Sequence, residues 1–209
     1  MTTDHRGSLR TKSWGQQSDF SVMDRFGMWL SERQIRKRVG GFRGKRIADI
    51  GCGYHAVFVK QILHEVAHAT VLDLVLSEEL KSESNLTAFE GPLPDTLERF
   101  DDGTLDVVLC NNVIEHLSKP KTAIEHMRRM LVPNGVLFLN VPSWTGKVVL
   151  ETAAFRLGWT RADEIDDHKA YYAPRELWRL LVESGFKPSE IQCRKHKFGL
   201  NTYALCTKS

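Results

Sequence analysis

Cysteine is scarce in this sequence, and its four cysteines form no metal-binding or disulfide pattern. Cys52, Cys110, Cys193 and Cys206 lie far apart, without a CxxC pair. An even number of cysteines does not by itself make a disulfide framework in a chain of 209 residues. We therefore expect four free thiols.

Long apolar runs are also absent. No stretch approaches the roughly 20 apolar residues that a membrane-spanning helix needs. The N-terminal stretch MTTDHRGSLRTKSWGQQSDF is polar and lacks the apolar core of a signal peptide. We therefore expect no membrane span and a cytoplasmic protein.

The sequence has no strong excess of charge of one sign. The net charge is +3, and the one basic cluster is RQIRKRVGGFRGKR, residues 33–46. A nucleic-acid surface would need a second basic stripe or interleaved aromatic residues, and neither is present. The cluster is typical of a helix that ends at Gly40 and Gly41, with cations in its last turn. We therefore do not expect nucleic acid to be the partner.

The sequence does contain alternating strand and helix patterns of one domain, residues 1–209. We expect residues 1–17 to be loosely ordered and an N-terminal helix at 19–39. The periodicity further predicts helices at 56–66, 118–131 and 174–184. It predicts strands at 46–50, 69–74, 86–89, 105–110 and 135–141, and a final hairpin at 190–195 and 201–207. Strands that alternate with helices indicate an α/β doubly wound, mostly parallel sheet. Residues 142–173 exceed a usual connection, so we expect a cap insertion over a site.

The stretch RIADIGCG marks the place where a ligand would lie. A short apolar strand ends in Gly51-Cys52-Gly53, and ligands of such sheets bind beyond the carboxyl ends of the strands. Glycines let the backbone turn tightly and let a ligand come close. Asp49 precedes the turn, and its charge favours a cationic or amine-bearing ligand over a phosphate.

A second acid, Asp73, ends the next strand in VLDL, 22 residues after Gly51. A carboxylate at this place can accept hydrogen bonds from two ribose hydroxyls. We therefore predict that Asp73 binds a ribose.

Several motifs in the right order now resemble one family. Five stretches resemble the class I S-adenosylmethionine-dependent methyltransferases, of the broad group often called type 11. They are ADIGCG, VLDL, DDGTLDVVLCNNVIEHL, MLVPNGVLFLNVP and DHKAYYAPRELWRLLVESGF. The resemblance covers residues 44–207. It implies a Rossmann-like seven-stranded sheet of order 3-2-1-4-5-7-6 with strand 7 antiparallel.

The resemblance also implies a cofactor, S-adenosyl-L-methionine, and the residues that bind it. Asp49 and Asp73 would be the two acids, and Asn111 follows the fourth strand where the family lines the cofactor pocket. The cofactor-binding positions carried over are Asp49, Gly51, Cys52, Gly53, Asp73, Leu74 and Asn111. The third glycine of the family motif is His55 here, which either points outward or lies over the methionine end of the cofactor. The acid that binds adenine stays unassigned between Glu90 and Asp95.

The chemistry that follows is methyl transfer, for which a protein mostly aligns the acceptor and the methyl group. We predict a small-molecule, glycan or lipid-type acceptor that is methylated at oxygen. His168 is the predicted general base, because an imidazole that titrates near neutral pH can accept a hydroxyl proton. His116, in NVIEHL, is predicted to be a packing residue. Asp166, Asp167 and His168 alone do not make a metal site.

Two other classes of function stay open. One is a nucleic-acid or protein methyltransferase, which the basic cluster favours. The other is a non-catalytic S-adenosylmethionine-binding module, which His55 favours. The sequence does not indicate the identity of the acceptor or the oligomeric state.

Overall fold

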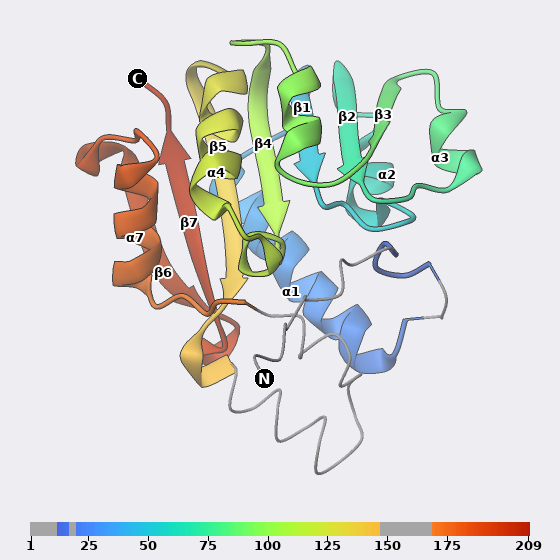
Figure 1. Cartoon of the computed structure of the whole chain (residues 1–209). Helices are drawn as coiled ribbons and strands as arrows, with labels where there is room; N and C mark the ends of the chain where they lie inside the picture. The colour runs from blue at the N-terminus through green and yellow to red at the C-terminus, as the bar shows by residue number, and fades with distance from the viewer. Residues whose placement is uncertain (1–11, 17–19, 147–168) are drawn as a thin grey trace, which may run out of the picture.

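The fold is a single seven-stranded sheet with helices on both faces (Figure 1). The structure, a computed structural model, describes residues 12–16, 20–146 and 169–209. The strand order is β3-β2-β1-β4-β5-β7-β6. Only the pairings of β7, with β5 and with β6, are antiparallel. The predicted fold class, strand order and direction of the seventh strand are confirmed.

The strands and helices have the following bounds. The strands are β1 Arg46–Ile50, β2 His68–Asp73, β3 Leu86–Glu90, β4 Leu105–Asn111, β5 Leu131–Pro142, β6 Ile191–His196 and β7 Asn201–Thr207. The α-helices are α1 Val22–Val39, α2 Val57–Ile62, α3 Glu78–Lys81, α4 Pro120–Met130 and α7 Pro174–Glu183. The short 3-10 helices are η1 Asp95–Arg99, η2 Ile114–His116, η3 Pro188–Glu190 and η4 Lys197–Gly199.

The bounds of α1 and α2 differ from the sequence expectation for local reasons. α1 begins at Val22 because Ser21 caps it: the Asp24 amide donates to Ser21 Oγ at 3.1 Å, and the Ser21 amide donates to Asp24 Oδ2 at 3.0 Å. α2 begins only after Ala56, which has a left-handed backbone with φ 42°. The helix ends early at Ile62, where the chain continues in turns instead of to residue 66.

The core lies on both faces of the sheet, as expected for parallel strands that are covered on both sides. On one face, α4 and α7 cover the sheet, and their Ile124, Met127, Leu177 and Leu181 are fully buried. On the other face, α1 and α2 cover it with side chains that include Ile35 and Val59. This arrangement leaves the ends of the strands as the places where a ligand can reach the sheet.

The carboxyl ends of the parallel strands lie together at the lower edge in Figure 1, where the arrow of β4 points. β7 runs the other way, so its first residue, Asn201, lies at this same edge, and Pro142 of β5 pairs with it. The described N-terminal residues 12–16 also lie at this edge, close to the ends of β1 and β2. The glycine turn, the acid after β2 and the loop after β4 therefore share one edge with residues 12–16.

Candidate cofactor-binding site

The turn after β1 has the geometry that only glycine adopts easily. Gly51 has φ 73° and Gly53 has φ 77°, in the left-handed region where a side chain costs free energy. A Cβ at Gly51 would overlap the side chain of Val113, which follows β4. At Gly53 a Cβ would lie 3.2 Å from the carbonyl oxygen of Trp14. The turn therefore contacts both the loop after β4 and the N-terminal residues.

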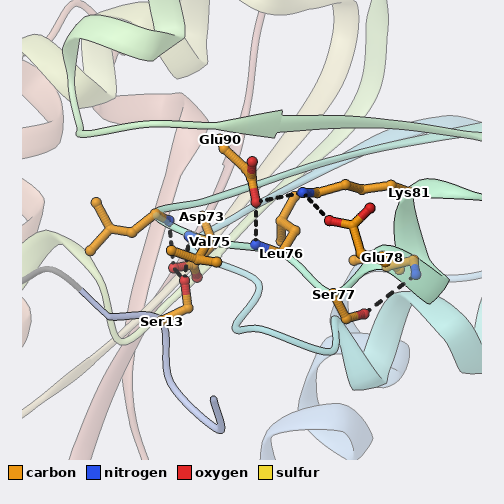
Figure 2. Close-up of polar contacts among 10 residues, drawn as sticks. Ser13, Asp73, Val75, Leu76, Ser77, Glu78, Lys81 and Glu90 are labelled. Atoms are coloured by element: carbon orange, nitrogen blue, oxygen red, sulfur yellow. Dashed lines mark hydrogen bonds and ion pairs between the residues drawn. The ribbon is translucent and has the colours of Figure 1, made fainter. Parts of the chain in front are cut away.

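Asp73 is the polar centre of the site (Figure 2). Its Oδ2 accepts a hydrogen bond from the Gly53 amide at 2.7 Å, which ties the end of β2 to the glycine turn. Its Oδ1 accepts from the Leu74 amide at 2.8 Å and from the hydroxyl of Ser13 at 2.5 Å. Asp73 thus already accepts a hydroxyl hydrogen bond, the kind that the sequence predicted it to accept from a ribose.

The sequence did not reveal Ser13 as part of this site. Ser13 is 5% exposed, and its Oγ also accepts a hydrogen bond from the Val75 amide at 2.7 Å. Next to it, the Trp14 carbonyl oxygen accepts from the Tyr54 amide at 2.9 Å. A serine in a polar N-terminal stretch carries no periodic signal, so only the folded chain brings it to Asp73.

Asp49 lies under the turn with 7% of its surface exposed. Burial, and then the charge of Asp73, raises the pKa of Asp49 to about 7. The carboxyl group is therefore near the balance between its neutral and ionised forms at neutral pH. A positive charge beside it would favour the ionised form, which suits an amine-bearing ligand.

Cys52 lies between the two glycines, and its thiol is not prepared for nucleophilic chemistry. Burial, followed by the negative charges of Asp49 and Asp73, raises the pKa of Cys52 well above its ordinary value. Because the thiolate is the reactive form, this thiol is unreactive at neutral pH. The four cysteines are free thiols, as predicted, and Cys110 and Cys206 are buried.

The acid of β3 has a partner that sequence reasoning did not foresee. Glu90 Oε1 accepts from the Leu76 amide at 2.7 Å and forms an ion pair with Lys81 at 3.0 Å (Figure 2). The backbone hydrogen bond and the charge of Lys81 lower the pKa of Glu90. Glu90 therefore holds the loop after β2 in place through the Leu76 amide.

The loop after β4 brings Asn111 close to the turn. Asn111 Oδ1 accepts from Asn140 Nδ2 of β5 at 2.7 Å. Two residues later, Val113 packs against Gly51. The described structure thus gathers Asp49, Gly51, Cys52, Gly53, Asp73, Leu74 and Asn111 at one edge of the sheet.

The predicted base and most of the predicted cap lie outside the described residues. These are His168 with its neighbours Asp166 and Asp167, and the aromatic residues Phe155 and Trp159. At the two ends of this segment, Trp144 and Tyr171 have ring centroids 5.7 Å apart. The amides of Lys169 and Ala170 donate to the carbonyl oxygen of Glu115, at 2.9 and 3.2 Å. Lys169 and Ala170 therefore lie beside the loop after β4.

Four of the seven cations in the basic cluster of residues 33–46 have partners within the chain. Arg36 lies 3.6 Å from Glu65, and Arg46 lies 3.9 Å from Asp106. The guanidinium groups of Arg33 and Arg38 lie over the rings of Trp29 and Tyr203. α1 ends at Val39 with Arg36, Lys37 and Arg38 in its last turn, which supports the interpretation of the cluster as a helix end.

Within residues 12–16, 20–146 and 169–209, no three histidine, cysteine or acidic side chains lie together as metal ligands. No helix in these same ranges is both long and apolar enough to cross a membrane.

The chain is similar in sequence to known methyltransferases. The family model described as "Methyltransferase domain" matches residues 26–191. The ubiquinone biosynthesis O-methyltransferase of Vibrio cholerae is 22% identical over 209 residues, which cover 94% of this chain and 83% of that protein.

Solved structures share the fold at lower identity. A SAM-dependent methyltransferase from Archaeoglobus fulgidus is 14% identical, with a TM-score of 0.63 over 90% of this chain and 100% of that chain. Haemonchus contortus phosphoethanolamine N-methyltransferase 2, in complex with S-adenosyl-L-methionine, is also 14% identical. Its TM-score is 0.64 over 86% of this chain and 52% of that chain. These two likenesses show the fold alone.

Proposed function

The chain belongs to the methyltransferase domain family, and we propose on that premise that it methylates a hydroxyl oxygen of a small molecule. As a member of this family it is an S-adenosylmethionine-dependent methyltransferase. The observation that carries the cofactor site in this proposal is the hydroxyl hydrogen bond that Asp73 accepts beside the glycine turn. A carboxylate in this place is equipped to accept hydrogen bonds from ribose hydroxyls.

The residues of the site fit this cofactor. Asp73 would hold the ribose, and the absence of side chains at Gly51 and Gly53 leaves the backbone open to a close approach. Asp49 would face the positive charge of the cofactor. Because the pKa of Asp49 is about 7, such a charge would shift its carboxyl group to the ionised form. Cys52, Leu74 and Asn111 would line the same pocket. When bound, the cofactor would supply an activated methyl group to the acceptor oxygen and leave as S-adenosylhomocysteine, while these residues would hold it in place.

Support for an oxygen atom on a small acceptor comes from relatives and from the edge of the sheet. The relative from Vibrio cholerae named above is an O-methyltransferase of ubiquinone biosynthesis. Aromatic side chains, Trp144 and Tyr171, flank the edge at which the acceptor would enter. The engagement of the basic cluster within the chain argues against a nucleic-acid acceptor.

We further propose His168 as the base that takes the hydroxyl proton. Its chain neighbours Lys169 and Ala170 donate hydrogen bonds to Glu115 in the loop after β4, on the side where the acceptor would lie. His168→Asn should lower turnover by about 100-fold or more while leaving cofactor affinity intact, on the scale of lost general-base catalysis. Turnover near that of the wild type with an unmoved pH profile would contradict this role.

The experiment for the proposed function is a methylation assay. The purified chain is mixed with S-adenosylmethionine and a panel of simple phenols and catechols, with short and long alkyl substituents. Mass spectrometry should detect a methyl ether together with S-adenosylhomocysteine. Calorimetric binding of S-adenosylhomocysteine without turnover of any acceptor would favour a non-catalytic binding module. Methylation of peptides or nucleic acid instead would favour a protein or nucleic-acid methyltransferase.

A further inference from the structure

Four asparagine side chains meet at the edge of the sheet where β4 and β5 end and β7 begins. Asn140 Nδ2 donates to Asn111 Oδ1 at 2.7 Å and to Asn112 Oδ1 at 3.3 Å. Asn201 Nδ2 donates to the same Asn112 Oδ1 at 3.2 Å. Asn140 is 1% exposed and Asn201 is 9% exposed, whereas Asn112 is exposed. Two buried amides therefore hold one amide that faces the outside.

The hydrogen bonds determine which way the amide of Asn112 points. Its Oδ1 accepts two hydrogen bonds, so both lone pairs are in use. In the opposite orientation, Asn112 Nδ2 would face the Nδ2 donors of Asn140 and Asn201, so these buried donors would lose an acceptor, which is costly. Its Nδ2 is therefore the outward group, and it has no hydrogen bond among the described residues.

The backbone of Asn112 is also held in place. Its φ is 56°, a left-handed conformation that asparagine tolerates better than most residues. Its amide donates to the carbonyl oxygen of Asn140 at 2.7 Å. The next residue, Val113, packs against Gly51 of the glycine turn. Asn112 therefore lies between the turn and the ends of β5 and β7.

The inference rests on the proposed function. If that function holds, the acceptor would lie at this place. Asp73 would hold the ribose at the end of β2, on one side of the glycine turn. The methyl group would then lie toward β4, on the other side. A donor fixed beside this point can bind an oxygen atom of the acceptor without taking part in the transfer itself.

We propose that Asn112 determines how the acceptor is oriented, by donating a hydrogen bond from Nδ2 to a second oxygen next to the reacting hydroxyl. Asn140 and Asn201 are positioning residues, which hold the Asn112 amide with its N–H groups outward. The role is one of specificity: without this donor, the acceptor ring can turn and present either oxygen to the methyl group.

The test uses 4-methylcatechol, an unsymmetrical ring with two neighbouring hydroxyls that gives two distinguishable methyl ethers. Asn112→Gly removes the amide and keeps the left-handed backbone. We expect KM for 4-methylcatechol to rise about threefold to tenfold, the scale of one lost hydrogen bond. The ratio of the two ethers should approach one, while the affinity for S-adenosylhomocysteine stays unchanged.

Asn134→Gly is the matched control. Asn134 is also exposed and left-handed, with φ 63°, but it lies near the start of β5, at the opposite edge of the sheet. It should keep the wild-type KM and product ratio. Asn112→Asp is the second variant, because an aspartate can still accept from Asn140 and Asn201 while the outward donor becomes a carboxylate oxygen. It should raise KM at least as much as Asn112→Gly.

The results separate this proposal from the proposed function. A product ratio and a KM for Asn112→Gly equal to those of Asn134→Gly would overturn the role of Asn112. If Asn112→Gly fails to fold, an unchanged KM and product ratio in Asn112→Asp would overturn it. Wild-type methylation of simple phenols but not of 4-methylcatechol would also overturn it and leave the proposed function standing. Absence of turnover across the whole panel would overturn both.

Discussion

At the scale of single residues, the site depends on polar groups that the fold has partly removed from water. Asp49 and Asp73 are two acids near the same turn, and the more buried one, Asp49, has its pKa raised to about 7. Ser13 binds the other acid directly, at 2.5 Å. Each of these contacts leads to a measurable consequence.

The first prediction concerns the pH dependence of stability. An unfolded aspartate titrates near pH 4, so between about pH 4 and pH 7 the folded chain holds a proton at Asp49 that the unfolded chain has lost. The contribution of Asp49 to the free energy of unfolding should therefore fall as the pH rises through this window, by up to about 1.4 kcal/mol per pH unit, and stay level above it. Urea unfolding of Asp49→Asn, followed from pH 5 to pH 8, should lack this component.

Asp101→Asn is the control for this titration, because Asp101 is exposed. It should follow the wild-type pH dependence. If the difference between wild type and Asp49→Asn does not change with pH, Asp49 does not titrate in this range.

The second prediction concerns Ser13. If the ribose and the Ser13 hydroxyl use the same oxygen of Asp73, removal of the hydroxyl should favour the ligand. We expect Ser13→Ala to bind S-adenosylhomocysteine about tenfold more tightly by calorimetry, the scale of a hydrogen bond to a charged group. Ser21→Ala, which removes the helix cap of α1, should leave this affinity unchanged. Weaker binding by Ser13→Ala would mean that Ser13 helps to hold the ligand.

At the scale of elements, the glycine turn joins β1 to the loop after β4. Gly51 is left-handed and directly faces Val113, so this position controls packing as well as ligand approach. The contact also places Asn112 beside the turn. Gly51 therefore connects the turn after β1 to the loop after β4 by direct packing against Val113.

The third prediction tests this contact. Gly51→Ala should lower the free energy of unfolding by about 2 kcal/mol or more, because backbone strain adds to the overlap with Val113. Gly103→Ala is the matched control: Gly103 is also left-handed, with φ 61°, but no atom lies within 4 Å of an added Cβ. The control should lose only the backbone part, about 1 kcal/mol.

Adding Val113→Ala to Gly51→Ala tests the cause of the loss. The double variant should be less destabilised than the sum of the two single variants, because the smaller side chain makes room for the added Cβ. Urea unfolding measures all of these values. Simple additivity would mean that Val113 does not limit the space at Gly51.

At the scale of the whole molecule, ligand binding should stabilise the complete domain. The candidate site draws residues from the glycine turn, β2, the loop after β4 and the N-terminal residues 12–16, so its ligand can bind only the folded chain. A ligand that binds only the folded state shifts the unfolding equilibrium by mass action.

The fourth prediction is therefore a rise in melting temperature. S-adenosylhomocysteine at about 100 times its Kd should add about 2.7 kcal/mol, which corresponds to roughly 5–10 °C for a domain of this size. Calorimetric melting curves should show a much smaller rise for Asp73→Asn at the same concentration. No rise in the wild type, together with no heat on titration, would contradict cofactor binding at this site.

The sequence by itself determined the architecture. Apolar strands alternate with amphipathic helices, and this local periodicity follows from which faces must be buried. The order of the strands came from the family motifs, and the structure confirms it. The glycines and the two acids were also visible, because a turn without side chains followed by an acid at the end of the next strand forms a local pattern.

Only the tertiary structure decided which distant residues complete the site. Ser13 reaches Asp73 across 60 positions of sequence, and Asn201 reaches Asn112 across 89. The raised pKa of Asp49 likewise depends on the burial of its carboxyl group and on the nearby charge of Asp73. Such contacts leave no periodic trace, because a hydrogen bond between two loops needs one polar atom on each side and no repeating pattern. They exist because the parallel strands end at a common edge and bring their loops together there.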